Sequence, residues 1–399
     1  MFSSKHKKRS LSKFFNWYSK HSDRADEEDV DSLIMKRAMS ETEDPEEFCD
    51  FSLDEGHLDY IRCMTISCDP ANEGAIVSEQ YLQLTLKSPK TTSLVKCVLG
   101  FLSTEQIQKQ LVAICIQGLN DVDLHLILKN VAEKCLSLKL LRFDDCVFGN
   151  NSMNVLLKYI TENANLYNLF IHSSSLSQVK RVYYDLDKIA ANSKLKGLII
   201  FGNTDVRSNG ELALLRIASR LAELRMFCVN VTKRGIFTID SSLEAAKCMR
   251  HLKSFCIDTS TIANPSQKEL RKIRNFIANT RSLNRVACID QSSHECNLEL
   301  IKSVLTNRGI EAADFTFEMT SQDLDLIART DTQLEFISIR EIKEVESCSI
   351  TTLINNLKAN RNLLYIQGKE NDLDNDLGQQ LNRALEGNRL AFMKRFGKF

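Results

Sequence analysis

The sequence predicts an α/β solenoid, in which short parallel strands alternate with helices along a chain of 399 residues. The first observation is a frame of apolar residues around one asparagine, Leu-x-x-x-Leu-x-x-Asn-x-x-Leu-x-x-Ile, which fills residues 353–366 without a gap. Steps of three and four residues are typical of one helix face, and the run after the asparagine indicates a strand. The second observation is that the frame recurs through residues 156–171 and returns in part at Leu381, Leu385 and Asn388.

A third observation gives the period. An apolar residue marks the start of each strand unit: Leu111, Leu138, Leu166, Leu195, Leu224, Leu252, Leu283, Ile310, Leu334 and Leu363. These marks recur at intervals of about 24 to about 31 residues, within the range of known repeat proteins. An asparagine stands three residues before several of them: Asn163, Asn192, Asn307 and Asn360. Between marks, residues such as Leu124, Leu128 and Val131 recur at helical steps. One strand and one helix cannot bury their apolar faces alone, so we expect the units to stack.

One unit carries a recognisable strand signature. The run Leu138-x-x-Leu141-x-Phe143-x-x-Cys146-x-Phe148 resembles the Leu-x-x-Leu-x-Leu-x-x-Asn/Cys-x-Leu motif of leucine-rich repeats. A period of about 28 residues with a full helix is similar to the ribonuclease-inhibitor-like class of that family. The resemblance covers about residues 80–399 and implies a horseshoe with parallel strands on the concave face and helices on the convex face. The ninth slot departs from Asn or Cys at several positions: Ser174, Thr232, Ser260, Gln291 and Ile342.

Charge and composition divide the chain into three parts. We expect residues 1–59 to be a disordered charged tail, basic over 1–24 and acidic over 25–59, because a strong charge excess with few apolar residues does not fold. We predict that residues 60–110 form an N-terminal cap with strands near 61–66 and 81–86, since a solenoid needs an atypical first unit. Residues 111–399 are then the leucine-rich-repeat array, ending in a C-terminal capping helix.

The basic tail allows more than one interpretation. Leu11, Phe14, Phe15 and Tyr18 share one helical face among basic residues, a pattern typical of a helix on an anionic membrane surface. The run Lys-His-Lys-Lys-Arg at residues 5–9 is equally typical of a nuclear-import or nucleic-acid patch. A solvated tail without a ligand is the plainer interpretation. Weak contact of residues 1–24 with an anionic membrane therefore stays open.

Composition limits the class of partner and the compartment. A formal charge of zero argues against a nucleic-acid-binding protein. The thirteen cysteines are diluted among apolar residues, which favours a reducing, cytoplasmic setting without disulfides. No secretory signal core is visible in residues 1–24, and no apolar run is long enough to cross a bilayer. We expect a monomer, and delivery into a host cell or the nucleus remains open.

Catalytic motifs are weak in this sequence. Cys256-Ile-Asp258 and Cys288-Ile-Asp290 resemble the Cys-x-Asp element of a bacterial leucine-rich-repeat ubiquitin ligase class. That class keeps its cysteine in a separate helical domain, whereas both elements here fall on predicted strands, so we expect structural cysteines. There is no glycine-rich phosphate loop and no Cys-x-x-Cys pair. We therefore predict no catalytic residue, no metal and no cofactor.

Alternation along the strands predicts the binding surface. If the fixed leucines point into the core, the residues between them face the concave side. Large and charged residues gather there, and the side chains predicted to bind a protein partner are Arg142, Phe170, His172, Ile199, Phe201, Met226, Phe336 and Tyr365. Two alternatives stay open. The amino-terminal segment covers this face, or the register is shifted by one residue and these side chains are core.

The function favoured by this pattern is a non-enzymatic scaffold that binds a protein on its concave face. A charged tail before an array resembles leucine-rich-repeat proteins of intracellular bacteria that act inside host cells. The alternative from another class is a regulator of a small GTPase, similar to the Ran GTPase activators, in which Arg142 or another concave or loop arginine acts on the nucleotide. A ubiquitin-ligase adaptor is a further alternative.

Overall fold

The computed structural model describes most of the chain beyond residue 62. The described residues are 63–68, 74–78, 83–87, 91–201, 207–221, 223–262, 265–289, 294–315, 317, 319–339, 342–343, 347–360, 362–368 and 376–396. The predicted charged tail, residues 1–59, lies outside them. The chain divides into two compact units, Met1–His251 (unit 1) and Leu252–Phe399 (unit 2).

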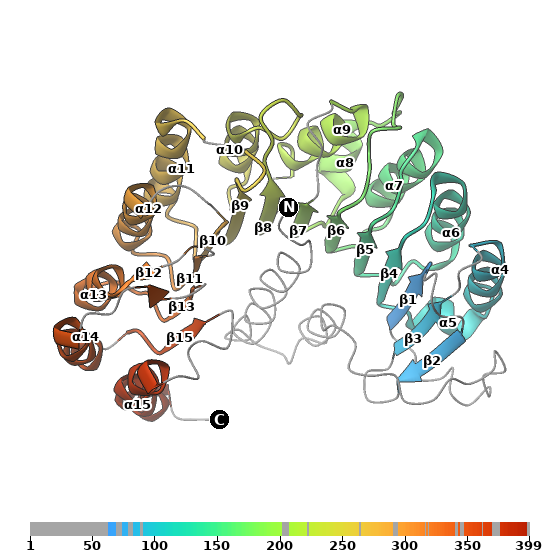
Figure 1. The fold of residues 1–399 in the computed structure, drawn as a ribbon. Helices are drawn as coiled ribbons and strands as arrows, with labels where there is room; N and C mark the ends of the chain where they lie inside the picture. Colours follow the sequence, from blue (N-terminus) through green and yellow to red (C-terminus); the bar gives the residue numbers. More distant parts are fainter. Residues whose placement is uncertain are drawn as a thin grey trace. The chain divides into compact units, whose positions relative to one another are not determined.

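Unit 1 alternates strands and helices in the predicted way. Its elements are β1 (Cys63–Ser67), β2 (Gly74–Ser78), β3 (Gln83–Lys87), α4 (Thr91–Leu102), α5 (Glu105–Gln110), β4 (Ala113–Gln117), α6 (Asp121–Lys134), β5 (Leu140–Asp144), α7 (Asn150–Glu162), β6 (Asn168–His172), α8 (Leu186–Asn192), β7 (Gly197–Phe201), α9 (Asn209–Ala218), β8 (Met226–Asn230) and α10 (Ile239–Cys248). The strands lie side by side in the order β8-β7-β6-β5-β4-β1-β3-β2. From β4 to β8 each strand pairs in parallel with the next, and α6, α7, α9 and α10 lie on one face of these strands (Figure 1).

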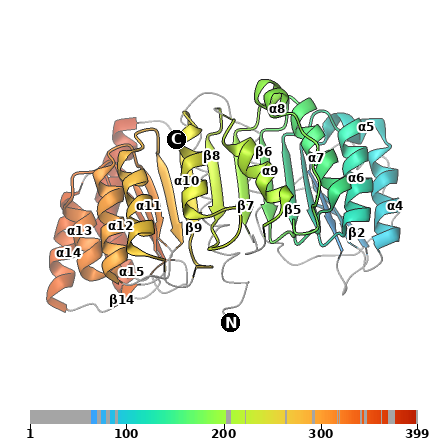
Figure 2. The same ribbon diagram turned by 90° about the horizontal axis from the view of Figure 1, so that it is seen from above.

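Unit 2 continues the same alternation. Its elements are β9 (Ser254–Asp258), α11 (Gln267–Asn279), β10 (Arg285–Ile289), α12 (His294–Thr306), β11 (Ala312–Phe315), β12 (Met319–Thr320), α13 (Ser321–Arg329), β13 (Phe336–Ile339), β14 (Ile342–Lys343), α14 (Ser347–Ala359), β15 (Tyr365–Gly368) and α15 (Asp376–Phe396). The strands β9, β10, β11, β13 and β15 are adjacent and parallel, while β12 and β14 form a separate parallel pair. Figure 2 shows α11, α12, α13 and α14 standing side by side.

The recurring apolar marks build the core of both units. All ten side chains are at most 2 % exposed. Each strand from β4 to β11, and likewise β13 and β15, begins two residues after its mark, as β5 begins at Leu140 after Leu138. Neighbouring strands then place Leu141, Leu169 and Leu198 directly beside one another. The α/β leucine-rich-repeat solenoid is thereby confirmed, because marks distant in sequence occupy equivalent positions in successive layers.

The recurring asparagines satisfy backbone groups where helices end. Asn307 follows α12, and its Nδ2 donates to the carbonyls of Ile277 (2.6 Å) and Thr280 (2.9 Å) in the preceding repeat, while its Oδ1 accepts from the Gly309 N–H (2.9 Å). Asn163 ends α7 and likewise accepts from the backbone two residues on and donates to the Leu138 carbonyl (3.4 Å). The last carbonyls of a helix have no partner within it. Asn163 and Asn307 therefore each tie their own repeat to the one before it.

A tight turn after the strands also repeats. The residues that follow β4, β5 and β6 have positive φ: Gly118 (74°), Asp145 (53°) and Ser173 (49°). The N–H of each donates to the carbonyl that ends the next strand, at 2.9, 3.0 and 2.8 Å. This conformation costs a residue other than glycine about 1 to 2 kcal/mol. The inter-strand hydrogen bond offsets part of that cost.

The first strands of unit 1 depart from the repeat. The two strands expected near residues 61–66 and 81–86 correspond to β1 and β3, which pair in parallel. A third strand, β2, was not predicted from the sequence; it is antiparallel to β3 and lies at the end of the sheet. That residues 60–110 act as a cap remains a prediction. Within the described part of the chain, no helix is both long and apolar enough to cross a membrane.

Truncating one buried leucine tests the stacking. Leu169 of β6 is fully buried, so Leu169→Ala removes apolar contacts, leaves a cavity and should lower the free energy of unfolding by about 2 to 5 kcal/mol. Leu136→Ala is the matched control, because Leu136 is 60 % exposed and its truncation should change stability by less than about 0.5 kcal/mol. Urea unfolding measures both. Equal stabilities for the two variants contradict the packing described here.

The asparagine contacts are tested in the same way. Asn307→Ala leaves two helix-end carbonyls without their side-chain donor, and the expected loss is about 1 to 3 kcal/mol. Asn279→Ala is the control, since Asn279 is exposed and donates within its own helix. Thermal melts of the two variants should differ by several degrees. A melt of Asn307→Ala that overlays the control counts against a structural role.

Candidate functional site

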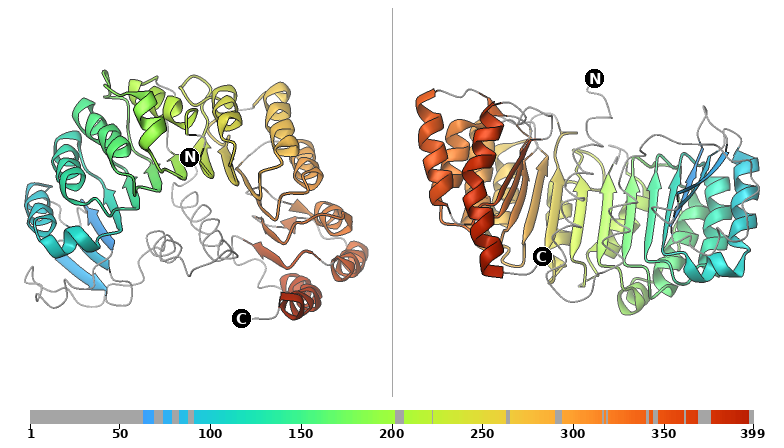
Figure 3. Two further views of the ribbon diagram at one scale, coloured as in Figure 1. Left: turned by 180° about the vertical axis from the view of Figure 1, so that it is seen from behind. Right: turned by 90° about the horizontal axis from the view of Figure 1, so that it is seen from below.

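The face of β4 to β8 opposite their helices carries the predicted binding residues of unit 1. Side chains alternate along a strand, so Leu141 and Leu169 point toward the helices, while Arg142 and Phe170, which also pair in register, point away from them. We call this surface the helix-free face, and it consists of Cys115, Leu140, Arg142, Asp144, Phe170, His172, Ile199, Phe201, Met226 and Cys228. None of the described helices α6 to α10 lies over it (Figure 3).

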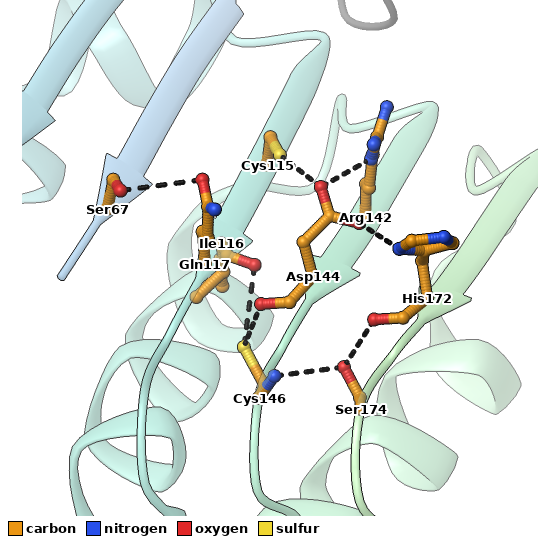
Figure 4. Close-up of polar contacts among 9 residues, drawn as sticks. All are labelled: Ser67, Cys115, Ile116, Gln117, Arg142, Asp144, Cys146, His172 and Ser174. Carbon is orange, nitrogen blue, oxygen red and sulfur yellow. Dashed lines mark hydrogen bonds and ion pairs between the residues drawn. The ribbon is translucent and has the colours of Figure 1, made fainter. Parts of the chain in front are cut away.

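Side-chain contacts fix the register of this face. Arg142 and Asp144 are alternate residues of β5, and their side chains meet those of Cys115 from β4 and His172 from β6 (Figure 4). Four side chains from three strands therefore lie on the same side of the sheet. A register shift of one residue, the second alternative of the sequence analysis, is excluded for these strands.

We call Cys115, Arg142, Asp144 and His172 the Asp144 cluster. Asp144 Oδ2 lies 2.8 Å from Arg142 Nε, and Asp144 Oδ1 lies 3.5 Å from His172 Nδ1. The Cys115 thiol donates to Asp144 Oδ2 at 3.8 Å. The carboxylate is nearly buried, while the side chains of Arg142 and His172 are 22 % and 17 % exposed. Asp144 thus pairs with Arg142 and lies beside His172, and both of these side chains reach the surface.

The electrostatics of the cluster oppose nucleophilic chemistry. Burial raises the pKa of Cys115 to about 12, so the thiol is neutral near pH 7 and is a poor nucleophile. Burial acts to lower the pKa of Arg142, but the neighbouring Cys115 and Asp144 together raise it above its ordinary value. The guanidinium is therefore charged at every physiological pH. The cluster can present a fixed positive charge, but it offers no activated thiol at Cys115.

Cys146 forms hydrogen bonds at the ends of the strands that carry the cluster. Its backbone N–H donates to Ser174 Oγ (3.0 Å), which in turn donates to the His172 carbonyl (3.1 Å), and its thiol donates to the carbonyls of Ile116 and Asp144 (both 3.4 Å; Figure 4). Burial raises the pKa of Cys146 to about 12. The cysteine of the repeat signature is thus structural. It fixes the strand ends that carry Asp144 and His172.

The apolar part of the helix-free face is buried. Phe170, Ile199, Phe201 and Met226 are 2 to 4 % exposed, although the sequence predicts that they belong to a binding surface. Phe170 pairs with Ile199, and Phe201 lies beside His172 in the register. Large apolar side chains therefore adjoin the Asp144 cluster directly.

The remaining predicted residues lie in unit 2. Phe336 of β13 is buried, and it pairs in register with Tyr365 of β15, whose side chain is 41 % exposed. The guanidinium of Arg389 from α15 lies 5.3 Å from the Tyr365 ring centre, which is a cation–π contact. Phe336 and Tyr365 are therefore neighbours within unit 2, whereas the helix-free face belongs to unit 1.

One polar residue of unit 2 was missed. Asp314 of β11 pairs with Ala287 and Ser338, so it belongs to the central row of its sheet, and it is buried. The repeat pattern predicts its position, because Asp314 lies four residues after the mark Ile310, as Arg142 does after Leu138. Cys256 and Asp258 lie on β9, as expected for structural residues. In the parts of the chain that the structure describes, no three His, Cys, Asp or Glu side chains are grouped to hold a metal ion.

Comparison with known proteins yields structural likenesses only. No family model and no curated protein matches the sequence. One similar solved structure is the leucine-rich repeat-containing protein LegL7 from Legionella pneumophila, at 12 % identity and a TM-score of 0.43, over 82 % of this chain and 98 % of that one. Another is a chain of the Rad7 and Elc1 complex from yeast, at 14 % identity and a TM-score of 0.41, over 91 % of this chain and 88 % of that one.

Neutralising the central carboxylate tests the cluster. Asp144→Asn keeps the shape but removes the negative charge beside Arg142, and we expect a loss of about 1 to 3 kcal/mol in unfolding free energy, less than the roughly 3 to 5 kcal/mol of a fully buried pair because Arg142 is partly exposed. Glu162→Gln is the control, since its pair with Lys158 is exposed and 3.9 Å long, and such pairs contribute little. If urea denaturation shows the same small effect for both, Asp144 does not organise the site.

Proposed function

We propose that the protein is a non-catalytic scaffold whose helix-free face of unit 1 binds a protein partner. The observation that carries this proposal is the strand register, which places the Asp144 cluster beside a row of large apolar side chains on a face over which no described helix lies. Large apolar side chains beside partly exposed polar groups are typical of protein interfaces. The parallel strands present this surface on a rigid support.

The geometry also indicates what the partner must supply. Phe170, Ile199 and Phe201 favour an apolar side chain or helix face, and Arg142 favours a carboxylate. Because Asp144 already holds Arg142 in place, little side-chain entropy is lost when the partner binds. The apolar contacts supply most of the affinity, and the charges set orientation and partner choice.

The alternative functions find less support. An arginine that acts on a nucleotide phosphate must extend into a partner's active site, whereas Arg142 is paired with Asp144 and mostly buried. Regulation of a small GTPase and a ligase-adaptor role are therefore secondary to general protein binding. Cys115, Cys146 and Cys228 are free thiols, which supports the proposal that the protein works in a reducing compartment, of a bacterium or of a host cell.

A charge-removing substitution tests the proposal. In affinity capture with the full chain, Arg142→Met keeps the aliphatic stem but removes the charge, and we expect captured partner to fall about tenfold or more, as for an interface arginine worth about 1.4 kcal/mol. Arg220→Met, an exposed arginine after α9, is the matched control and should capture as much as the unmodified chain. Undiminished capture by a folded Arg142→Met protein contradicts the assignment of this face.

A further inference from the structure

We propose that the edge of unit 1 at which its strands begin binds an extended acidic segment of a protein partner. The residues that carry this proposal stand immediately before β5, β6, β7 and β8, and we call them the basic row: Lys139, Tyr167, Lys196 and Arg225. None of them belongs to the helix-free face. This second surface therefore rests on its own observations and goes beyond the proposed function.

Backbone hydrogen bonds hold the basic row together. The Tyr167 N–H donates to the Lys139 carbonyl (2.8 Å), and the Lys196 N–H donates to the Tyr167 carbonyl (2.7 Å). The Arg225 N–H donates to the Lys196 carbonyl (2.7 Å). Neighbouring strands are about 4.8 Å apart, so the backbone of the row spans about 14 Å. The contacts that pair the strands thus bring three cationic residues into one line.

Tyr167 positions two of these cations. The Lys196 Nζ lies 4.6 Å and the Lys139 Nζ lies 5.9 Å from the centre of the Tyr167 ring, within the range of cation–π attraction. Two like charges beside one ring repel each other, and the attraction of the ring offsets part of that repulsion. A carboxylate bound near the ring is attracted by both ammonium groups.

The charges of the row are accessible to a partner. Lys196 and Arg225 are exposed, while Lys139 and Tyr167 are half-buried. Neither Lys196 nor Arg225 forms an ion pair with another residue that the structure describes. An acidic partner therefore does not have to displace an internal carboxylate from these two side chains.

The surrounding connections carry an excess of positive charge. Four connections join a helix of unit 1 to the strand of the next repeat: residues 135–139, 163–167, 193–196 and 219–225. Their cationic residues are Lys139, Lys194, Lys196, Arg220 and Arg225. Their single acid is Glu223, whose Oε1 lies 3.7 Å from His251 Nε2. A local excess of one sign attracts partners of the other sign and speeds their association.

Attraction to the helix ends does not explain the row. The partial negative charge of a helix C-terminus favours cations, but this effect falls off within the last turn. Lys139, Lys196 and Arg225 each stand at least four residues past the end of the preceding helix, which is α6, α8 or α9. A role outside the fold accounts better for cations at these positions.

An acidic peptide fits the row better than a nucleic acid. Surfaces for single-stranded nucleic acids combine cations with aromatic rings on which bases stack, whereas the Tyr167 ring already contacts two ammonium groups. Alternate side chains of an extended peptide are about 6.8 Å apart, so three successive side chains on one side span about 14 Å, as the row does. The partner segment therefore carries an acidic residue at every second position.

Binding of a defined peptide to the full chain tests the proposal. The probe is a fluorescein-labelled peptide of alternating glutamate and serine residues, and fluorescence anisotropy measures its dissociation constant. We expect saturable binding that weakens as salt is raised. The double variant Lys196→Glu with Arg225→Glu should weaken binding about tenfold or more. Lys129→Glu with Lys188→Glu is the matched control, because both lysines are exposed and lie on helices outside the row; it should weaken binding by less than about threefold.

Substitution of Tyr167 separates a built site from charge alone. Tyr167→Leu removes the ring without changing any charge and should weaken peptide binding about threefold. Tyr167→Phe keeps the ring and should bind as the unmodified chain does. Equal affinities for the two variants contradict the role of the ring in positioning the lysines. Far-UV circular dichroism identifies any variant that fails to fold.

The remaining outcomes overturn the proposal. If the peptide does not bind, or if both double variants lose the same affinity, the basic row is not a binding site. If a single-stranded oligodeoxynucleotide of equal charge binds more tightly than the peptide and depends on Lys196 and Arg225, the row takes a nucleic acid. Arg142→Met should leave peptide binding unchanged, so a failure of the basic row is distinguishable from a failure of the helix-free face.

Discussion

The structure depends on burial of one apolar side chain per repeat at an equivalent position in successive layers. Each unit has a strand and a helix that cannot exclude water from their shared face alone, so stability comes from contact with neighbouring units. Burying a leucine contributes roughly 1.5 to 3 kcal/mol, and all ten marks are buried. Because side chains alternate along a strand, this burial also decides the opposite surface. Once Leu169 points toward the helices, Phe170 has to point away.

Polar groups make the stacking specific. Apolar burial alone tolerates sliding of one layer on another, but hydrogen bonds at the helix ends and turns do not. Asn307 joins its repeat to the preceding helix, and Cys146 joins strands β4, β5 and β6 through Ser174 and two carbonyls. The same contacts hold the strand ends where Asp144 and His172 emerge. The groups that fix the register therefore also fix the geometry of the helix-free face.

Much of this architecture could be predicted from the sequence, because the marks report burial directly. A fixed offset from each mark locates the strands and the central row, including Asp314, which the same rule finds. The antiparallel strand β2 could not be found, since it lies outside the repeat and Gly74–Ser78 carries no mark. The pairing of Asp144 with Arg142 and His172 needs the register between strands. The burial of Phe170 could not be predicted either, because the exposure of a strand residue depends on its neighbours in the adjacent strands, and these follow only from the register.

Neighbouring repeats thus stabilise each other through the buried marks. Native-state hydrogen exchange of the full chain carrying Leu169→Ala tests it most directly, since amide protection reports local opening strand by strand. The account predicts faster exchange in β6 and also in its neighbours β5 and β7, with the effect fading toward β1. Faster exchange confined to β6, with β5 and β7 as protected as in the unmodified protein, would contradict stacking as the source of stability.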